Sequence, residues 1–263
     1  VVAADAEIGR GTPTIDGEID SVWESATAYE IANSVPVADG VPIEDDADLS
    51  GTWKALWDDS HFYILYEIND SDRIRDNWDA EANEGQNHWD DSVELYLATS
   101  GPDAEYSNFR WTIGDPQKLD SYSGPVEWAD IDPEPVATEI VDNGDSYIVE
   151  VSIPWESFYD YAGVSAGQTI YLDVHVNDDD AEPALADNMR DGKLAWYGTE
   201  DNAWQGTENF GTATLIGDGS SPAMPNTGMG GADGPAAMSA WVIALAAVTT
   251  IFAVRFAIAR ANK

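Results

Sequence analysis

Two tryptophans in the last third of the chain are the residues whose type and spacing most clearly indicate chemistry. Trp196 and Trp204 stand eight residues apart, with polar and turn-forming residues between them. This pattern predicts that at least one indole, and we expect Trp204, lies on a loop outside the apolar core. An exposed indole can cover the apolar C–H face of a pyranose ring while nearby polar groups hydrogen-bond the sugar hydroxyls. The segment therefore favours carbohydrate binding by Trp204.

Motifs typical of catalysis are missing from the sequence. It contains no Gly-x-Ser-x-Gly elbow, no His-Glu-x-x-His motif, no phosphate-binding Gly-rich loop and no cysteine. Two of its three histidines, His61 and His175, fall within strand patterns, where a structural role is expected. A glycosidase needs two carboxyl groups that face each other across the sugar, and sequence spacing does not establish that geometry. We therefore expect a binding protein and not an enzyme.

The chain is strongly acidic. Its 263 residues include 11 Lys and Arg against 50 Asp and Glu, which gives a formal net charge of −39. A phosphate backbone would be repelled by this charge, so nucleic acid is excluded as a partner. The acidity is compatible with cation binding, a saline habitat or solubility. Because 11 Trp and 11 Tyr accompany the charges, the chain can still bury a core.

Alternating apolar and polar residues indicate β-strands between about residues 8 and 216. The predicted strands are 52–57, 61–68, 92–97, 108–113, 147–153, 169–176 and 211–216. Short helical turns are expected at 20–25 and 154–158. Many short strands without alternating helices predict an all-β fold, an antiparallel β-sandwich of the jelly-roll type. Four tryptophans lie in apolar patterns and are assigned to the core: Trp23, Trp53, Trp57 and Trp155.

The C-terminal part of the chain has the features of a membrane anchor. Residues 236–254 carry no charge, and Arg255, Arg260 and Lys263 follow directly. This order is typical of one transmembrane helix with a basic cytoplasmic flank, which places the acidic bulk of the protein outside the cytoplasm. The predicted organisation is a sandwich domain at 1–216, a flexible Gly/Pro/Ser-rich linker at 217–235, and a transmembrane helix with a basic tail at 236–263.

The linker also contains a short motif, Met224-Pro225-Asn226-Thr227-Gly228. Together with the apolar span and basic tail, it resembles the sorting signal that sortase transpeptidases cut between Thr and Gly, although Met224 stands where Leu is usual. The chain begins at Val1 without an apolar signal segment, which we interpret as a removed secretion signal. We expect an extracellular protein anchored at the cell surface by its membrane helix or, after sortase processing, to the cell wall.

A set of ordered blocks between residues 11 and 216 resembles the family 9 carbohydrate-binding modules that are appended to xylanases. The matching blocks are 11–23, 55–58, 62–65, 91–96, 109–110, 147–155, 176–178, Trp196, Trp204 and 210–211. The resemblance implies a noncatalytic β-sandwich that binds the ends of sugar chains, of the xylan or glucan type, between two tryptophans. It also implies calcium ions that hold loops.

The resemblance assigns roles to individual residues. Trp204 matches one of the two sugar-stacking tryptophans. Glu94 and Arg110 match the carboxylate and the guanidinium that hydrogen-bond sugar hydroxyls, and a cross-strand ion pair is the alternative interpretation of the two. Thr112 and Asp201 occupy two positions that are usually Asn, and both can still bond hydroxyls.

The second stacking tryptophan of the family has no exact counterpart. Its position, two residues before the Asp-Ser-Val-Glu block, falls on His88, while Trp89 stands one residue later. A shift by one residue reverses the facing of a side chain in a strand, but a loop can absorb it. Either Trp89 supplies the second stacking face, or the site has only one.

Calcium is the cofactor that the resemblance implies. Calcium takes six to eight oxygen ligands from carboxylates, carbonyls and water. Acidic turns that could supply them lie at 16–20, 46–51, 69–72 and 177–180, although any one of these turns could equally be a solvated surface loop. The candidate ligands are Asp16, Glu18, Asp70, Asp72 and Asp178.

Two further functions remain open from the sequence. Related sandwich domains hold haem b between axial ligands such as Met and His, for which the candidates here are Met189, His175 and His88. Alternatively, the fold has become a structural or adhesive surface protein whose sugar site is eroded.

Overall fold

A computed structural model describes residues 5–37, 43–71, 78–79, 84–85, 88–113, 118–125, 136–180 and 190–217. All of them belong to the first of two compact units, Val1–Ala223. The predicted linker, sorting motif and membrane segment lie outside the described residues, apart from Gly217 at the start of the linker. In the described part of the chain, no helix has the length and apolarity needed to cross a membrane.

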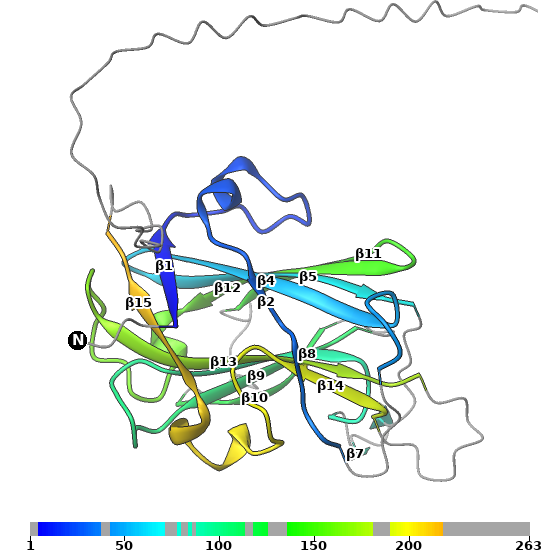
Figure 1. The fold of residues 1–263 in the computed structure, drawn as a ribbon. Coiled ribbons are helices and arrows are strands. Elements are labelled where there is room, and N and C mark those ends of the chain that lie inside the picture. The colour runs from blue at the N-terminus through cyan, green and yellow to red at the C-terminus, as the bar shows by residue number, and fades with distance from the viewer. Residues whose placement is uncertain are drawn as a thin grey trace, which may run out of the picture. The chain divides into compact units, whose positions relative to one another are not determined.

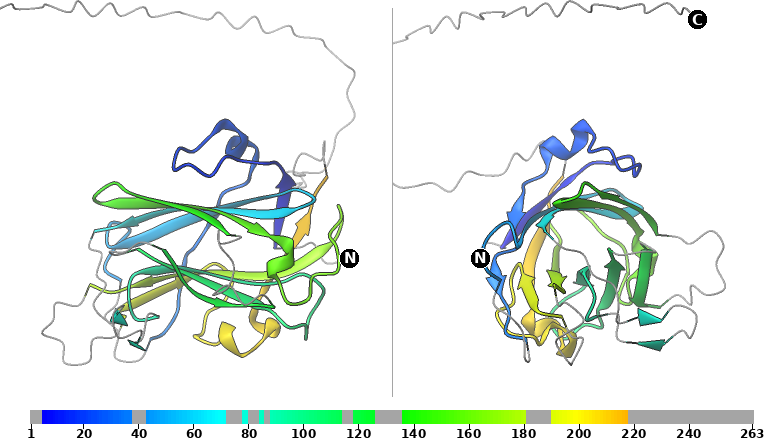
Figure 2. Two further views of the ribbon diagram at one scale, coloured as in Figure 1. Left: turned by 180° about the vertical axis from the view of Figure 1, so that it is seen from behind. Right: turned by 90° about the vertical axis from the view of Figure 1, so that its right-hand side faces the viewer.

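The described domain is an all-β fold, as predicted, and its strands form two facing layers (Figures 1 and 2). Within the described residues, its only helices are short 3-10 turns. The first layer has the strand order β10–β9–β8–β13–β15–β1. Its strands are β10 (Lys118–Ser123), β9 (Ser107–Thr112), β8 (Ser92–Ala98), β13 (Thr169–Asp178), β15 (Gly211–Leu215) and β1 (Ala6–Arg10). Beyond β13, β14 (Gly192–Ala195) pairs with the end of that strand, and β3 (Asn33–Ser34) pairs with β14.

The second layer has the order β4–β5–β12–β11. Its strands are β4 (Leu49–Trp57), β5 (His61–Asp70), β12 (Ser146–Pro154) and β11 (Ala137–Asp142). Strand β2 (Tyr29–Glu30) pairs with β4. Strand β1 joins the layers, because its first half pairs with β15 and its second half with β4. Two very short strands, β6 (Trp78–Asp79) and β7 (Glu84–Gly85), pair with each other.

The main core lies between the two layers and is rich in aromatic rings. Trp53, Trp57 and Trp155 are fully buried in it, and Trp23 is buried in a smaller cluster with Leu56, so the four tryptophans assigned to the core are confirmed. Both predicted helical turns are also present, as η1 (Ser21–Ser25), with the Asp20 side chain as its N-cap, and η3 (Trp155–Ser157).

All seven residues of β8 are buried, which shows that both faces of this strand are covered. Val93, Leu95 and Leu97 belong to the main core. The other face carries Glu94 and Tyr96, and Tyr96 packs in a separate cluster with residues of the segment that contains η4 (Ala203–Gln205) and η5 (Thr207–Asn209). Figure 1 shows this segment, in gold, on the side of the first layer that faces away from the second layer. The candidate site forms between β8 and this segment.

Candidate functional site

The floor of the site is a polar row across three adjacent strands of the first layer. The strand register places Glu94 of β8 directly opposite Arg110 of β9 and, on the other side, opposite His175 of β13. Side chains opposite each other in neighbouring strands share one face of the sheet. Because the alternate residues of β8 face the core, the sheet projects its charged groups outward as one cluster.

Glu94 is the centre of this cluster. The Nε atom of Arg110 donates a hydrogen bond of 2.6 Å to Glu94 Oε1, and the hydroxyl of Tyr96 lies 3.3 Å from Oε2. Lys193 Nζ lies 3.5 Å from the same Oε2. Burial alone would raise the pKa of Glu94, but Arg110, Lys193 and His175 hold that pKa well below its usual range. Glu94 is therefore an ionised carboxylate, and it forms the cross-strand ion pair considered above.

A second ion-paired carboxylate, Asp201, stands before η4. Its Oδ1 lies 2.9 Å from Lys193 Nζ, and its Oδ2 accepts a hydrogen bond from Arg190. Burial works to raise the pKa of Asp201, but the charges of Lys193 and Arg190 lower it. Arg190 also donates to the Asn177 side chain at 3.2 Å and to the His88 carbonyl at 3.3 Å. These contacts tie the segment before η4 to the ends of β13 and β14.

Trp204 is the exposed aromatic of the site. Its side chain is 62% exposed, which confirms the prediction that it lies outside the core. Its Nε1 donates to the Asp201 carbonyl at 3.0 Å, and its own carbonyl accepts a 2.5 Å hydrogen bond from Tyr106. The backbone and one edge of the indole are therefore held, while much of the ring remains open to solvent. A held aromatic face loses little entropy on binding a ligand.

These groups surround a cavity of about 400 Å³, within the size range of small-molecule sites. Its lining residues are Val37, His88, Trp89, Glu94, Tyr96, Arg110, Arg190, Lys193, Asp201 and Trp204. Five of the six predicted ligand-binding residues thus lie around one cavity. His88 and Trp89 both line it, so the structure brings both candidates for the second stacking position to the same site.

Thr112 is the predicted ligand-binding residue that does not line the cavity. It lies two residues from Arg110 on β9, opposite Ser92 of β8, and both Thr112 and Ser92 are fully buried. A covered hydroxyl cannot reach a ligand, so direct contact between a sugar and Thr112 requires movement of this part of the sheet.

The histidines of the site do not suit a haem. His175 is 1% exposed and lies between Glu94, at 3.4 Å, and Asp173, at 3.0 Å. An iron atom could reach neither ring nitrogen without displacing a carboxylate. Burial, followed by the charges of Arg110 and Arg190, lowers the pKa of His88 to about 4, which keeps this residue neutral at pH 7. Met189, the third haem candidate, lies outside the described residues.

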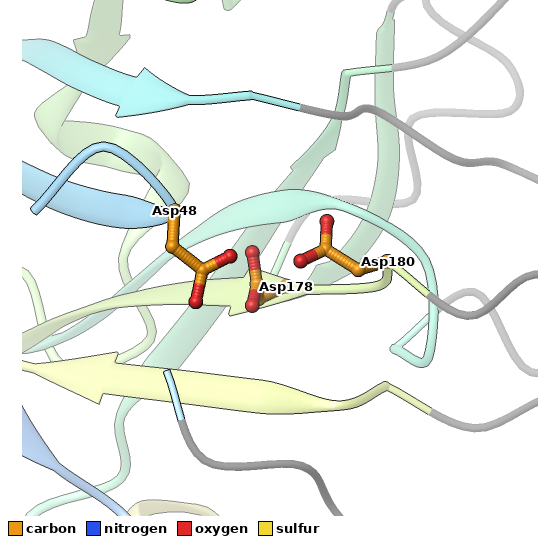
Figure 3. Close-up of side chains that lie close together, drawn as sticks. All are labelled: Asp48, Asp178 and Asp180. Atoms are coloured by element: carbon orange, nitrogen blue, oxygen red, sulfur yellow. The ribbon is translucent and has the colours of Figure 1, made fainter. Parts of the chain in front are cut away.

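A second functional candidate is a cluster of aspartates at the end of β13. Asp178 lies close to Asp48 and Asp180 in one grouping and to Asp70 and Asp91 in another, with carboxylate oxygens of each grouping within 4.8 Å of one another. Figure 3 shows the first grouping, in which the three carboxylates approach one another from the start of β4 and the end of β13. Asp70, Asp91 and Asp178 are buried.

The electrostatics of this aspartate cluster suit a hard cation. Burial and the neighbouring charges of Asp180, Asp70 and Asp48 raise the pKa of Asp178 to about 8. Asp178 Oδ1 is buried and has no hydrogen-bond partner among the described residues. An unsatisfied buried carboxylate is costly, and a divalent cation would neutralise the group and provide its missing contact. The donor set, carboxylate oxygens alone, fits calcium or magnesium better than zinc.

The predicted metal ligands therefore divide. Asp70 and Asp178 come together, while Asp72 lies outside the described residues. Asp16 and Glu18 are exposed and stand apart from the described carboxylate clusters. Asp16 Oδ1 instead accepts a hydrogen bond from the backbone N–H of Glu18 at 3.0 Å, which is the local turn bond typical of an Asp in this position.

Some site residues were not predicted from the sequence. Arg190 and Lys193 were missed, although basic residues are so rare in this chain that two of them close to Asp201 were a usable signal. Tyr96 belongs to the matching block 91–96, but it was not assigned to the site. Asp48 and Asp180 fell within acidic turns that were named as candidates, but neither was selected. The approach of Asp48, and of Asp70 and Asp91, to Asp178 depends on tertiary packing.

The sequence model of a known family, described as "Carbohydrate family 9 binding domain-like", matches residues 15–218. The chain belongs to this family, whose members are noncatalytic binding modules, so the resemblance and the prediction of a binding protein are confirmed.

Among curated proteins, the chain is similar to the exoglucanase XynX of Acetivibrio thermocellus, with 29% identity over 212 residues, and to the endo-1,4-beta-xylanase A of Thermotoga maritima, with 26% identity over 212 residues. These matches cover 79% and 78% of this chain but only 17% of each relative. The similarity is thus confined to one module of much longer enzymes.

Solved structures of the same fold include a carbohydrate-binding module of family 9 from Caldicellulosiruptor kristjanssonii. Its complex with cellotriose aligns with a TM-score of 0.58 and 19% identity, over 85% of this chain and 99% of that chain. Its complex with glucose gives a TM-score of 0.58 and 20% identity, over 83% and 98% of the two chains. At this level of identity the comparison supports the fold.

Proposed function

We propose that the cavity beside Trp204 binds the end of an oligosaccharide. The observation that carries the proposal is the juxtaposition of an indole that is 62% exposed with an ion-paired floor, Glu94 and Arg110, around one cavity. A sugar unit has the same two-sided character, an apolar C–H face and a rim of hydroxyls. Trp204 would cover the face, and the charged groups would bind the rim.

The charged residues of the floor would orient the sugar and contribute to its affinity. An ionised Glu94 accepts hydrogen bonds from hydroxyls, and Arg110 donates to hydroxyl oxygens. Each hydrogen bond to a charged group contributes about 1.5–3 kcal/mol. Because both side chains already hold each other in place, they lose little freedom when a ligand arrives. Trp89 would supply a second apolar wall.

The ligand class that we propose is a glucan or xylan end. The support is indirect: a solved module of the same fold was obtained with cellotriose and with glucose, and the curated relatives are named as an exoglucanase and xylanases. In those enzymes the similar segment is a small part of the chain.

Calcium is the cofactor that we propose for the aspartate cluster. Asp178 would hold it by carboxylate oxygens, with Asp70 and Asp91 as its partners in one grouping and Asp48 and Asp180 in the other. The ion would have a structural role: it would fix the end of β13, three residues beyond His175, and the start of β8, two residues before Glu94. Both strands carry the floor of the cavity.

Surface display rests on the sequence alone. We propose that the segment from 217 to 263 tethers the binding module at the cell surface, through a membrane helix or through sortase processing at Thr227-Gly228. A structural or adhesive role with an eroded sugar site is the competing function, and sugar binding is the property that separates the two.

Isothermal titration of the protein with glucose, cellotriose and xylotriose tests the proposed function. The variant Trp204→Ala should lose about ten- to a hundredfold in affinity, because a stacked face contributes about 1–3 kcal/mol. Tyr197→Ala is a matched control, since Tyr197 is an exposed aromatic nearby that does not line the cavity. Equal affinity of Trp204→Ala and the unaltered protein, or no heat from any sugar, would contradict the proposal.

A further inference from the structure

A second cavity, of about 530 Å³, lies on the far side of the segment that carries Trp204. Three parts of the chain form it: the loop before β9, the segment after η3, and the segment from η4 to η5. Its volume is within the range of small-molecule sites. The proposed function makes no use of this cavity, which we call the second cavity.

The second cavity shares a wall with the cavity beside Trp204. Tyr96 lines the first cavity and Tyr106 lines the second, and the centroids of their rings are 6.0 Å apart. Trp204 lines the first cavity, whereas the next residue, Gln205, lines the second. The Tyr106 hydroxyl donates a 2.5 Å hydrogen bond to the Trp204 carbonyl, which closes this wall. A chain with its end in the first cavity would reach the second one by passing Trp204.

The lining of the second cavity has the same two-sided chemistry as the first. Tyr159 lines it with a side chain that is 41% exposed, which offers an aromatic face to a ligand. Gln205 is also exposed, and its amide can both donate and accept hydrogen bonds. Glu105 and Glu208 add carboxylates that can accept hydrogen bonds from hydroxyls. An apolar face beside such groups suits a sugar unit.

The walls of the second cavity are tied together by hydrogen bonds. The backbone N–H of Asp103 donates to the Thr207 hydroxyl at 2.9 Å, which fixes the loop before β9 against η5. Asp103 is the only described residue other than glycine with a positive φ, 70°, a conformation that Asp tolerates. The backbone N–H of Tyr159 donates to the Ser107 hydroxyl at 3.1 Å. Walls held in this way lose little freedom when a ligand binds.

We propose that the second cavity is a further subsite for the same glycan. The end of the chain would lie in the cavity beside Trp204, and later units would lie in the second cavity, with a ring against Tyr159 and hydroxyls near Gln205. This inference rests on the proposed function and specifies the length of its ligand. Among the described residues, no basic side chain lines the second cavity, so Glu105 and Glu208 favour a neutral chain over an anionic one.

Titration with sugars of increasing length tests the inference. The probes are glucose, cellobiose and cellotetraose, with xylose, xylobiose and xylotetraose in parallel. In the series that binds, the tetrasaccharide should bind at least about tenfold more tightly than the monosaccharide, because a second stacked ring adds to the contact. One tetrasaccharide should bind per protein, because its units occupy both cavities.

Substitution of Tyr159 separates the second cavity from the first. Tyr159→Ala should lower the ratio of tetrasaccharide to monosaccharide affinity about tenfold. Tyr197→Ala is the matched control, because Tyr197 is 44% exposed and lines neither cavity, and it should leave this ratio unchanged. Gln205→Ala is a second variant that covers the case in which Tyr159→Ala does not fold. It should lower the ratio about threefold, through the loss of a neutral hydrogen bond.

The outcomes separate this inference from the proposed function. Equal affinity for the monosaccharide and the tetrasaccharide, or a ratio that is the same in both variants and the unaltered protein, would overturn the inference and leave the proposed function standing. Two tetrasaccharides bound per protein would also overturn it, since the cavities would then hold separate ligands. Binding of no sugar from either series would overturn the proposed function and this inference with it.

Discussion

Strand β13 contributes to both regions, because His175 contacts Glu94 in the floor of the cavity beside Trp204 and Asp178 belongs to the aspartate cluster. The two regions favour opposite protonation states of a buried carboxylate. In the cavity, cations lower the pKa values of Glu94 and Asp201 against the effect of burial. In the cluster, burial and neighbouring carboxylates raise the pKa of Asp178 to about 8. The surroundings therefore stabilise the ionised carboxylate in the cavity and destabilise it in the aspartate cluster.

This difference shows what each region lacks. The carboxylates of the cavity have their counter-charges within the protein, so the cavity is preorganised before a ligand arrives. The aspartate cluster instead brings several carboxylates close together, and burial with the neighbouring charges raises the pKa of Asp178, so a bound cation would lower the cost of ionising it. A preorganised site suits recognition, whereas a group of close carboxylates suits a structural metal.

Neutralising one carboxylate in each region should change the free energy of unfolding in opposite directions. The larger change should come from the carboxylate in the cavity beside Trp204. Glu94→Gln leaves Arg110 and Lys193 buried without their shared anion, and breaking a buried pair costs about 3–5 kcal/mol. We expect the midpoint of thermal unfolding to fall by about 10 °C. Circular dichroism during heating measures it. An unchanged midpoint would show that the ion pair does not stabilise the fold.

The matched substitution in the cluster is Asp178→Asn. Without calcium it should raise the free energy of unfolding by about 2 kcal/mol, because the neutral amide needs neither ionisation beside like charges nor the proton uptake that a pKa of about 8 imposes on folding at pH 7. With calcium it should instead lower the midpoint, because a ligand of the ion is lost. Destabilisation of equal size in both conditions would contradict the assignment of this cluster as a cation site.

Calcium removal should lower the stability of the unaltered protein by about 4 kcal/mol when the starting calcium concentration is a thousandfold above the dissociation constant. The corresponding fall in the unfolding midpoint is about 10 °C. Thermal unfolding with EDTA and with excess calcium measures the difference. Sugar binding should weaken in EDTA as well, because the ends of β8 and β13 lose their common support.

The pH dependence of stability should differ between the calcium-free and the calcium-bound protein. Because the folded pKa of Asp178, about 8, lies above its unfolded value, the calcium-free protein should lose stability as the pH rises from about 4 to 8, at up to about 1.4 kcal/mol per pH unit. The lowered pKa of Glu94 acts in the opposite direction, so its contribution is lost at low pH. Bound calcium should abolish the loss above pH 4. Urea unfolding across this pH range measures the effect.

The smallest expected effect on stability is that of Trp204→Ala. Because its side chain is 62% exposed, the free energy of unfolding should change by no more than about 0.5 kcal/mol. Urea unfolding of the variant measures it. A much larger loss would mean that the indole supports the fold rather than a ligand.

The sequence predicted the strands whose faces alternate cleanly or are wholly apolar. Strands β4, β5, β8, β12 and β13 contain the predicted segments and extend by one to three residues. Strands that break the pattern were missed. None of the six residues of β11 is buried, and the four-residue β14 contains Lys193, a buried charge that interrupts its apolar pattern.

The same limit applies to the site. Glu94, Arg110 and Trp204 stood in recognisable blocks, and alternation along a strand is enough to place the first two on one face. The partners of Asp201 depend on the pairing of β13 with β14, and the approach of Asp48 to Asp178 depends on contact between the two layers. Such contacts join residues far apart in sequence, so no local sequence pattern predicts them.

A crystal structure of the protein with calcium and cellotriose tests the proposed site most directly. We expect a terminal sugar ring against the indole of Trp204, with hydroxyls within hydrogen-bond distance of Glu94 or Arg110. A trisaccharide bound on another surface, with the cavity beside Trp204 holding only water, would contradict it.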